Sequence, residues 1–287
     1  MGVPSPYSLL CRLTARMSDF LTEMSEASLA RAHDTRQRAG RAGLASQMDS
    51  APPPIPLRLS DQGFDVIAEA KLASPSEGRL TDGDADRVVE LAGEYQAGGA
   101  AAISVLTEEI AFAGHLSHLE AAAAAVEVPV MRKDFLVDPI QVSEARAVGA
   151  SGVLLIARIL PGALLQEMTD LALSLGMFVL VEVFDRSDLE TAVPVFDREL
   201  LVGVNCRDLA SLDVDRSRFA SLAPHLPDHL PAVAESGVTE PEHAAEVVDA
   251  GYSLALVGST LARSHRPGQR LAEILGVGRL AWEVATS

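Results

Sequence analysis

Short apolar runs recur along the chain at nearly regular intervals, and eight of them have the length and the Val-, Ile- and Leu-rich content of buried parallel strands. The intervals are roughly 22 to 35 residues, which leaves room for one helix after each strand. Alternation of this kind predicts repeated βαβ units in a parallel sheet. The eight strand candidates begin near Val66, Ala101, Val128, Gly152, Phe178, Leu200, Ala232 and Leu254.

The segments between these runs carry helix signals. Asp84 to Ala97 has apolar residues at helical spacing among charged ones, and Asp138 to Val148 follows an Asp-Pro start. Glu240-Pro241 opens a helix that runs to Ala250-Gly251. No long linker or change of composition interrupts residues 65–261. We therefore predict the α/β class, with a single (β/α)8 TIM barrel over residues 57–287.

The segment before the first strand has a different pattern. Met17 to Ala39 is rich in helix formers of mixed charge, and Pro52-Pro53-Pro54 breaks the stretch from Ala45 to Pro56. We interpret residues 17–56 as a helical extension of one or two helices that caps an end of the barrel. It either covers the mouth as a lid or seals the opposite end. Residues 1–16 contain no acidic residue and are expected to be a ragged N-terminus or the product of a start codon upstream of Met17, with a targeting peptide as the alternative.

Polar residues stand at the ends of four apolar runs. Lys71 and Lys133 end two of them, and Glu182 and Asn205 end two others. Charge is costly inside a buried strand, and the carboxyl ends of parallel strands meet on one face, so we expect these side chains to converge. A (β/α)8 barrel builds its active site at that face. For each residue alone, the alternative is an ion pair that stabilises the barrel mouth.

The composition narrows the class of partner. Apolar residues make up 48% of the chain, and the two cysteines are too few for a disulfide framework, which favours a reducing cytoplasm. No stretch of about 18 apolar residues lacks a charge, so we expect no membrane span. The net charge of −17 argues against nucleic acid and anionic membranes as partners. A small anionic substrate remains compatible, because a few cations can dominate one pocket.

Six ordered segments at the strand ends carry the most specific signal. They are Ile67-Ala68-Glu69-Ala70-Lys71-Leu72-Ala73-Ser74-Pro75-Ser76, Ile103-Ser104-Val105-Leu106-Thr107-Glu108, Arg132-Lys133-Asp134-Phe135-Leu136-Val137-Asp138-Pro139, Val181-Glu182-Val183, Gly203-Val204-Asn205-Cys206-Arg207-Asp208-Leu209 and Ala234-Glu235-Ser236-Gly237-Val238. In this order the segments resemble those of the indole-3-glycerol phosphate synthase family. The resemblance covers roughly residues 60 to 275.

The resemblance implies a reaction and roles for five residues. In that family 1-(2-carboxyphenylamino)-1-deoxyribulose 5-phosphate cyclises to indole-3-glycerol phosphate with loss of carbon dioxide and water, a step of tryptophan biosynthesis. An aromatic carbon attacks a ketone carbon, so a general acid must protonate the ketone oxygen. By resemblance Lys133 is this acid, oriented by Glu69 and Glu182. The resemblance implies that Lys71 is a second cation, which holds the phosphate or carboxylate of the substrate or acts as the dehydration acid. It implies that Glu182 is the base and that Asn205 donates a hydrogen bond to a substrate hydroxyl.

Two loops carry the signs of a phosphate site. Ser236-Gly237 follows the seventh strand and Gly258-Ser259 the eighth, where many barrels bind phosphate with backbone N–H groups. Lys71, Gly237, Gly258 and Ser259 are the expected phosphate ligands, although Gly258 alone is equally explained by a strand-to-helix turn. We expect Arg207 to face the carboxylate of the substrate and apolar residues to form a slot for its ring. The other expected contacts of the substrate are Ser74, Pro75, Phe112, Phe135, Ile156, Arg207, Leu209, Glu235 and Ser236.

Four positions depart from the pattern of that family. Leu72 and Glu77 stand where basic residues are frequent, His115 where serine is common, and Phe184 where a polar residue is frequent. Leu72 and Glu77 reduce the positive charge near the mouth. This leaves open the alternative that the protein is a second copy of the enzyme that serves a secondary indole pathway. His115 and His118 have helical ligand spacing, but no further His or Cys cluster accompanies them. We therefore expect neither a metal nor an organic cofactor.

Two other functions remain open. A different phosphate-binding barrel, an isomerase or aldolase, would use Lys133 to form a Schiff base. A non-catalytic barrel would serve as a scaffold, although scaffolding needs none of Lys71, Lys133, Glu182 and Asn205. In the leading interpretation the protein is a cytoplasmic carboxy-lyase, a monomer or weak homo-oligomer, that binds a small phosphorylated anion.

Overall fold

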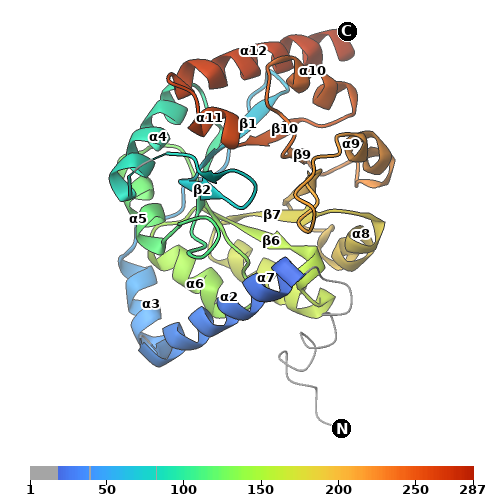
Figure 1. The fold of residues 1–287 in the computed structure, drawn as a ribbon. Coiled ribbons are helices and arrows are strands. Elements are labelled where there is room, and N and C mark those ends of the chain that lie inside the picture. Colours follow the sequence, from blue (N-terminus) through green and yellow to red (C-terminus); the bar gives the residue numbers. More distant parts are fainter. Residues whose placement is uncertain (1–18, 39, 82) are drawn as a thin grey trace.

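A closed barrel of eight parallel strands forms the centre of the molecule (Figure 1). The computed structural model describes residues 19–38, 40–81 and 83–287. Each strand pairs with the next one around the barrel, and β10 pairs with β1 to close the ring. The prediction of eight strands and a (β/α)8 barrel is confirmed. The strands are β1 (Asp65–Ala70), β4 (Ala102–Leu106), β5 (Val130–Lys133), β6 (Gly152–Ile156), β7 (Phe178–Val183), β8 (Leu201–Asn205), β9 (Ala232–Glu235) and β10 (Leu254–Val257).

The strands are buried on both faces, which explains their almost continuous apolar sequences. Every residue of β1, β4, β6 and β8 is buried, and one large apolar cluster joins the strands to the inner faces of the helices. Four of the charged residues in these strands lie close to the carboxyl ends: Glu69, Lys133, Glu182 and Glu235. The polar residues of the sheet are thereby brought to one face of the barrel.

Helices surround the barrel, and their starts follow the signals in the sequence (Figure 1). The side chains of Asp84 and Asp138 accept hydrogen bonds from the N–H groups of Asp86 (3.1 Å) and Ile140 (2.9 Å). Within the described ranges no helix has both the length and the apolar character needed to cross a membrane. The outer helices are α4 (Ala85–Ala97), α5 (Leu116–Ala125), α6 (Pro139–Ala147), α7 (Gly162–Ser174), α8 (Arg186–Ala192), α9 (Ser217–Leu222), α10 (Glu242–Asp249), α11 (Ser259–Ala262) and α12 (Pro267–Ala285), with 3-10 turns η2 (Ala157–Ile159), η3 (Val193–Val195) and η4 (Ala223–His225).

A small hairpin stands in the loop between β1 and α4. Its strands β2 (Ala73–Ser74) and β3 (Gly78–Arg79) pair antiparallel, with Ser74 opposite Gly78. The hairpin begins two residues after Lys71, so it extends from the carboxyl end of β1. That end of the barrel is the mouth.

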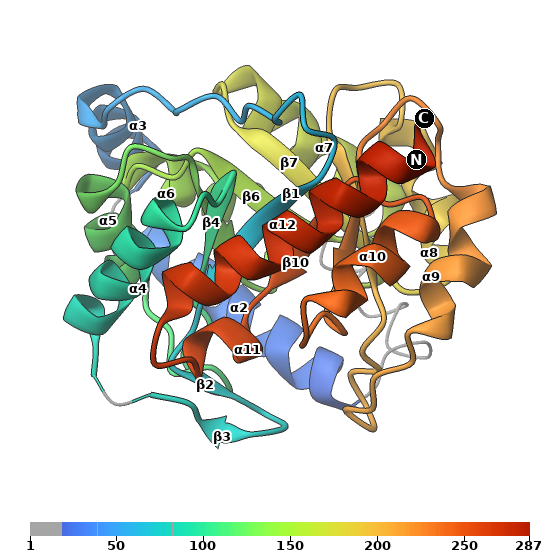
Figure 2. The same cartoon turned by 90° about the horizontal axis from the view of Figure 1, so that it is seen from above.

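Among the residues that the structure describes, two helices precede the barrel, α2 (Asp19–Arg38) and α3 (Gly40–Ser50). In Figure 2, α2 lies on the same side of the barrel as β2 and β3, while the chain that follows α3 crosses the opposite side before it enters β1. There the N–H of Ile55 donates to Ser151 Oγ (2.9 Å), directly before β6. The extension thus has one part at each end of the barrel. Residues 1–16, expected to be a ragged N-terminus, lie outside the described residues.

Candidate active site

A buried lysine stands between two carboxylates in the mouth of the barrel. Lys133 ends β5, Glu69 lies in β1 and Glu182 in β7. The Nζ atom of Lys133 is 3.6 Å from Glu182 Oε2 and 3.8 Å from Glu69 Oε2. Three strands that are far apart in the sequence therefore deliver one cation and two anions to the same point, as the pattern of strand ends predicts.

The carboxylates determine the charge of Lys133. Burial lowers the pKa of this lysine, but the charges of Glu182, Glu69 and Glu235 outweigh burial and raise the pKa above its ordinary value of 10.5. For Glu69, burial raises the pKa, while Lys71 and Lys133 outweigh it and lower the pKa below its ordinary value. Lys133 is thus held as an ammonium and Glu69 as a carboxylate at neutral pH.

The second lysine shares Glu69 with the first. Lys71 follows β1, and its Nζ atom is 2.8 Å from Glu69 Oε1, the oxygen that does not face Lys133. The side chain of Lys71 is 13% exposed and that of Lys133 is 17% exposed, so both reach the open mouth. One carboxylate therefore bridges two ammonium groups that remain accessible to a small molecule.

Asn205 at the end of β8 links Glu182 to the next loop. Its Nδ2 group donates to Glu182 Oε1 (3.3 Å), and its Oδ1 atom accepts from Ser236 Oγ (2.9 Å) and from the N–H of Arg207 (2.9 Å). These contacts fix the amide and one oxygen of the carboxylate. The other oxygen, Glu182 Oε2, is buried and has no hydrogen-bond partner among the described residues.

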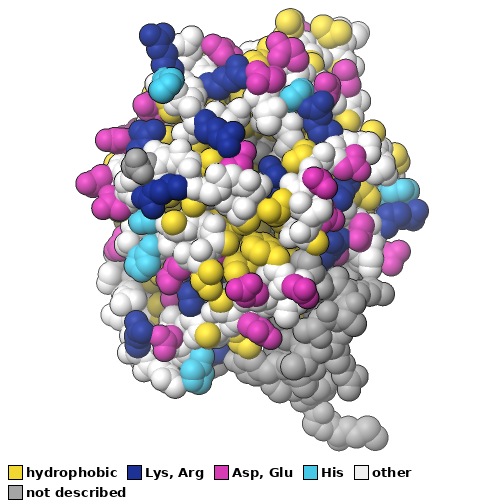
Figure 3. All heavy atoms as spheres, in the orientation of Figure 1, with side chains coloured by type: hydrophobic (Ala, Val, Ile, Leu, Met, Phe, Trp, Pro, Cys, Tyr) yellow, Lys and Arg dark blue, Asp and Glu magenta, His cyan; other side chains and the backbone are white. Residues whose placement is uncertain are grey.

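A pocket opens at this point and contains most of the expected substrate contacts. Figure 3 shows a hollow near the centre of this face, with apolar side chains gathered below it. Three predicted residues, Glu182, Phe135 and Ile156, are buried and are not among the lining residues. The ring of Phe135 lies 6.3 Å from that of Phe112 in the lining, and Ile156 pairs with Glu182 in the β6–β7 register. The predicted residues that line it are Glu69, Lys71, Ser74, Pro75, Phe112, Lys133, Asn205, Arg207, Leu209, Glu235, Ser236, Gly237, Gly258 and Ser259.

Arg207 enters the pocket with its charge unshared by a carboxylate in the described contacts. Its NH1 group donates to the carbonyl of Leu212 (2.8 Å) and weakly to Ser76 Oγ (3.5 Å). Both partners are neutral groups. The guanidinium is therefore positioned by the loop after β8 and the hairpin loop, and it keeps its attraction for an anion.

The two predicted phosphate loops meet at one end of the pocket. Ser236 and Gly237 both have left-handed backbone conformations, with φ of 65° and 76°, a rare state for serine. At Gly258 an added Cβ would lie 2.3 Å from Glu69 Oε1 and 3.0 Å from Lys71 Nζ. The glycine after β10 therefore makes room for the ion pair of Glu69 and Lys71, a reason that the sequence pattern does not reveal.

One residue that lines the pocket comes from outside the barrel. Phe20 of α2 reaches the lining, and its ring meets the ring of Phe135 edge-on at 5.8 Å. The sequence analysis did not identify Phe20, because a single aromatic residue in a polar helix has no recognisable motif. Its position depends on how α2 docks on the barrel.

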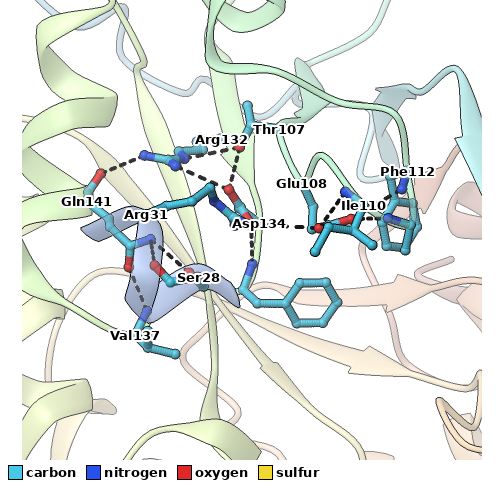
Figure 4. A network of polar contacts seen from close by, with 12 residues as sticks. Ser28, Arg31, Thr107, Glu108, Ile110, Phe112, Arg132, Asp134, Val137 and Gln141 are labelled. Carbon is cyan, nitrogen blue, oxygen red and sulfur yellow. Dashed lines mark hydrogen bonds and ion pairs between the residues drawn. The ribbon is translucent and has the colours of Figure 1, made fainter. Parts of the chain in front are cut away.

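A buried polar network fixes α2 to the barrel beside Lys133 (Figure 4). Arg31 of α2 donates to Asp134 Oδ1 (2.7 Å), and Arg132 binds the other oxygen of Asp134 (3.1 Å). Asp134 also accepts from Thr107 Oγ1 (2.8 Å), and Ser28 of α2 accepts from Gln141 (2.8 Å). Asp134 follows Lys133 directly, so the docking of α2 is connected to the strand end that carries this lysine.

The departures from the family pattern have local explanations. Leu72 is buried in the core, and Glu77 pairs with Arg263 at 3.0 Å. The guanidinium carbon of Arg158 lies over the buried ring of Phe184, 4.6 Å from the centre of the ring. The side chain of His115 accepts from the N–H of Ser117 and caps α5. Across the part of the chain that the structure describes, no group of three or more His, Cys, Asp or Glu residues is arranged to hold a metal ion.

Comparison with other sequences gives concordant matches over most of the chain. The family model described as indole-3-glycerol phosphate synthase matches residues 21–274. The indole-3-glycerol phosphate synthase of Mycobacterium avium is 45% identical over 231 residues, which span 80% of this chain and 84% of that protein. The enzyme of the same name from Streptomyces griseus is 41% identical over 245 residues, 85% of this chain and 87% of that protein.

Solved structures resemble the fold at low sequence identity. A 3-hexulose-6-phosphate synthase from Salmonella typhimurium has a TM-score of 0.61 and 12% identity, and covers 76% of this chain and 100% of its own. A thiamine phosphate pyrophosphorylase from Pyrococcus furiosus has a TM-score of 0.54 and 17% identity, and covers 77% of this chain and 98% of its own. At this level of identity the likeness concerns the barrel fold.

Proposed function

Because the chain belongs to the indole-3-glycerol phosphate synthase family, we propose that its barrel mouth closes the indole ring with Lys133 as the general acid. The protein is a decarboxylating lyase of tryptophan biosynthesis that converts 1-(2-carboxyphenylamino)-1-deoxyribulose 5-phosphate to indole-3-glycerol phosphate. The observation that carries the assignment of Lys133 is its buried ammonium between the carboxylates of Glu69 and Glu182. A cation fixed by two anions can deliver a proton to the ketone oxygen as the new carbon–carbon bond forms.

The protons of the whole reaction can be assigned to three groups. Lys133 gives the ketone oxygen its first proton, and Lys71 gives the same oxygen its second when it leaves as water. Glu182 takes one proton from the carbon next to the ring nitrogen, and carbon dioxide leaves its electron pair in the ring. Two protons enter the substrate and one departs, so each turnover consumes one proton from solution. Glu182 lies 3.6 Å from Lys133, which supports a return of its proton to that lysine.

Glu182 is favoured as the base over Glu69 because its oxygens are differently engaged. Glu69 is bound to both lysines, at 2.8 and 3.8 Å. In the described contacts Glu182 is paired with only one lysine, Lys133, at 3.6 Å. A carboxylate that is paired with one cation is a better proton acceptor than one that is paired with two. We assign the positioning of Lys133 and Lys71 to Glu69.

The remaining contacts follow from the chemistry of the pocket lining. Arg207, whose described hydrogen bonds go to neutral groups, suits the carboxylate of the substrate. Phe112, Leu209 and Pro75 offer apolar surface for its aromatic ring, and α2 with Phe20 serves as a lid. We assign the phosphate to Lys71 and to the loops at Gly237, Gly258 and Ser259.

A Schiff-base mechanism is the alternative chemistry for Lys133. It needs a neutral amine, whereas the surrounding carboxylates raise the pKa of Lys133 and keep it charged. Borohydride added together with substrate separates the two mechanisms, because it reduces only an imine. We expect no increase in the mass of the peptide that contains Lys133. A reduced adduct there would favour an aldolase or isomerase.

The direct test of the function is conversion of the substrate by the purified protein. Indole absorbance and fluorescence should appear when the carboxyphenylamino deoxyribulose phosphate is added at neutral pH, with release of carbon dioxide. Folded protein that yields no indole product at any pH from about 6 to 9 would contradict the proposal.

We place this enzyme in the cytoplasm as a monomer or weak homo-oligomer without a nucleic-acid partner. The net charge of −17 supports the last point, since nucleic acid would be repelled. Sedimentation velocity at several concentrations measures the state of association. A tight oligomer at the lowest concentration would contradict that part of the proposal.

A further inference from the structure

Glu235 is a third carboxyl group in the mouth of the barrel. It ends β9, only 1% of its surface is exposed, and it lies opposite Asn205 of β8 in the sheet register. Both of its carboxyl oxygens are buried, and neither has a hydrogen-bond partner among the described residues. An ionised carboxylate in such a place would lose its hydration without compensation, which costs several kcal/mol.

A glycine makes room for this carboxyl group. An added Cβ at Gly203 in β8 would lie 2.0 Å from Glu235 Oε1, closer than any side chain can approach. In the same strand register Gly203 stands opposite Glu182 of β7. The carboxyl group of Glu235 therefore lies over the bare backbone of Gly203, in the gap beside Glu182. Glu182 Oε2 is likewise buried without a hydrogen-bond partner among the described residues.

The two lysines of the mouth are already paired with other carboxylates. The ion pairs of Lys71 and Lys133 are with Glu69 and Glu182, at 2.8 to 3.8 Å. The charges of the two lysines are thus balanced by Glu69 and Glu182 without Glu235. A further negative charge would repel both neighbouring carboxylates and a substrate that carries a carboxylate and a phosphate.

We propose that Glu235 is kept as an uncharged carboxylic acid and donates its proton in a hydrogen bond to Glu182, so that it positions Glu182 as the ionised base. Two carboxylates can only accept hydrogen bonds, and a single proton between them joins Glu182 Oε2 to one of the two unpartnered oxygens of Glu235. The role of Glu235 rests on the proposed function, because it acts through Glu182. Its protonation does not rest on that function.

Taken together, burial and the groups that face Glu235 raise its pKa. Burial, and then the negative charge of Glu182, raise the pKa of Glu235 well above its ordinary value, and Glu69 of β1 adds to this effect. Lys133 of β5 opposes it. Asn205 of β8 is neutral. The proton is therefore retained at pH values at which a surface glutamate has lost it.

Infrared spectroscopy of the free protein tests the protonation directly. We expect the wild type at pH 7 to show the carbonyl stretch of a protonated carboxyl group and Glu235→Gln to lack that band. Glu144→Gln is the matched control and should keep the band, because Glu144 pairs with Arg132 at 2.7 Å, outside the mouth. Absence of the band from the folded wild type overturns the proposal, whether or not the protein makes an indole.

Proton linkage gives a second measurement without substrate. The folded wild type holds a proton on Glu235 that the unfolded chain has lost above its ordinary pKa of 4.5. Relative to Glu235→Gln, the unfolding equilibrium constant of the wild type should therefore rise about tenfold per pH unit between that value and the raised pKa. A ratio that is independent of pH in this window, or that falls as pH rises, contradicts the proposal.

Kinetics then test the positioning role. Glu182→Gln should lower kcat by about 10² or more, the usual contribution of a positioned base. Glu235→Gln retains a donor toward Glu182 and should lose less than tenfold in kcat, whereas Glu235→Ala should lose more than tenfold with little change in KM. Equal losses in kcat for Glu235→Gln and Glu182→Gln would overturn the role. If Glu182→Gln alone stays near wild-type kcat, the assignment of the base fails while the infrared band still reports on Glu235.

Discussion

At the scale of single residues, the proposed chemistry depends on Lys133, a lysine whose charge is fixed by its neighbours. Lys133→Met keeps the length of the side chain and removes the ammonium. We expect turnover to fall by at least about 10²-fold, because ring closure would lose its positioned acid. Steady-state kinetics with circular dichroism as the control for folding measure this effect. Turnover within a fewfold of the wild type would mean that Lys133 is not the acid.

The raised pKa of Lys133 gives a pH prediction. An acid works while it is protonated, and the carboxylates around Lys133 move the loss of its proton above the ordinary pKa of 10.5. Deprotonation of Lys133 should therefore cause no decrease in kcat/KM below that pH. Glu182→Gln removes the largest of these charges and should move any limb that belongs to Lys133 to lower pH. An unchanged limb in that variant would assign it to another group.

Two glycines of the phosphate loops should respond differently to alanine. At Gly258 the new Cβ would meet Glu69 and Lys71, so Gly258→Ala should lower kcat as well as raise KM. At Gly237 the new Cβ would meet Cys206 Sγ at 2.8 Å, away from the lysines, and Gly237→Ala should mainly raise KM. Parallel kinetics on the two folded variants make this comparison. Identical losses in kcat would mean that Gly258 does not protect the ion pair.

At the scale of elements, α2 can be tested by one side chain. Phe20→Ala removes the ring that borders the pocket and should raise KM severalfold with a small change in melting temperature, because the ring lines the pocket and is only partly buried against the core. Glu26→Ala on the exposed face of the same helix is the matched control and should leave both quantities unchanged. An unchanged KM in Phe20→Ala would remove α2 from the active site.

Deletion of residues 1–50 is a less specific test than the point variant. It removes Arg31 and leaves the buried carboxylate of Asp134 with fewer donors, so stability should fall together with substrate binding. Residues 1–16 can be deleted separately, and we expect that truncation to be harmless. We propose residues 17–56 as the functional unit of the extension and 57–287 as that of the barrel.

The strands were predictable and the docking of α2 was not, for a physical reason. Parallel strands buried on both faces need continuous apolar runs, and charge is tolerated near their ends, so the sequence marks both the strands and the polar mouth. The buried residues of α2 are Ser25, Ser28 and Ala32 beside only two larger apolar residues, Leu21 and Met24. Such a stripe is weakly apolar, and its partners are polar side chains more than a hundred residues away.

At the scale of the whole molecule, the net charge of −17 contrasts with a mouth that must hold a phosphate. Inorganic phosphate should compete with substrate and raise the melting temperature of the protein, because it binds only the folded state. A phosphate concentration of about 100 times its Kd should stabilise the folded protein by about 2.7 kcal/mol. For a chain of this size, that raises the melting temperature by several degrees. Gly237→Ala should reduce that rise. A melting temperature that does not respond to phosphate would place the phosphate group elsewhere.

The long-range contacts of α2 also determine the order in which the parts of the chain fold. Ser28 and Gln141 are 113 residues apart in the chain, and Arg31 and Asp134 are 103 apart. During synthesis α2 emerges first and waits on the order of ten seconds for β5 and α6 to follow. A lone helix of this length is marginal in water, so α2 docks only after the barrel around Lys133 has formed. The pocket acquires Phe20 in that last step, and catalytic competence should therefore lag behind barrel formation as the newborn chain folds.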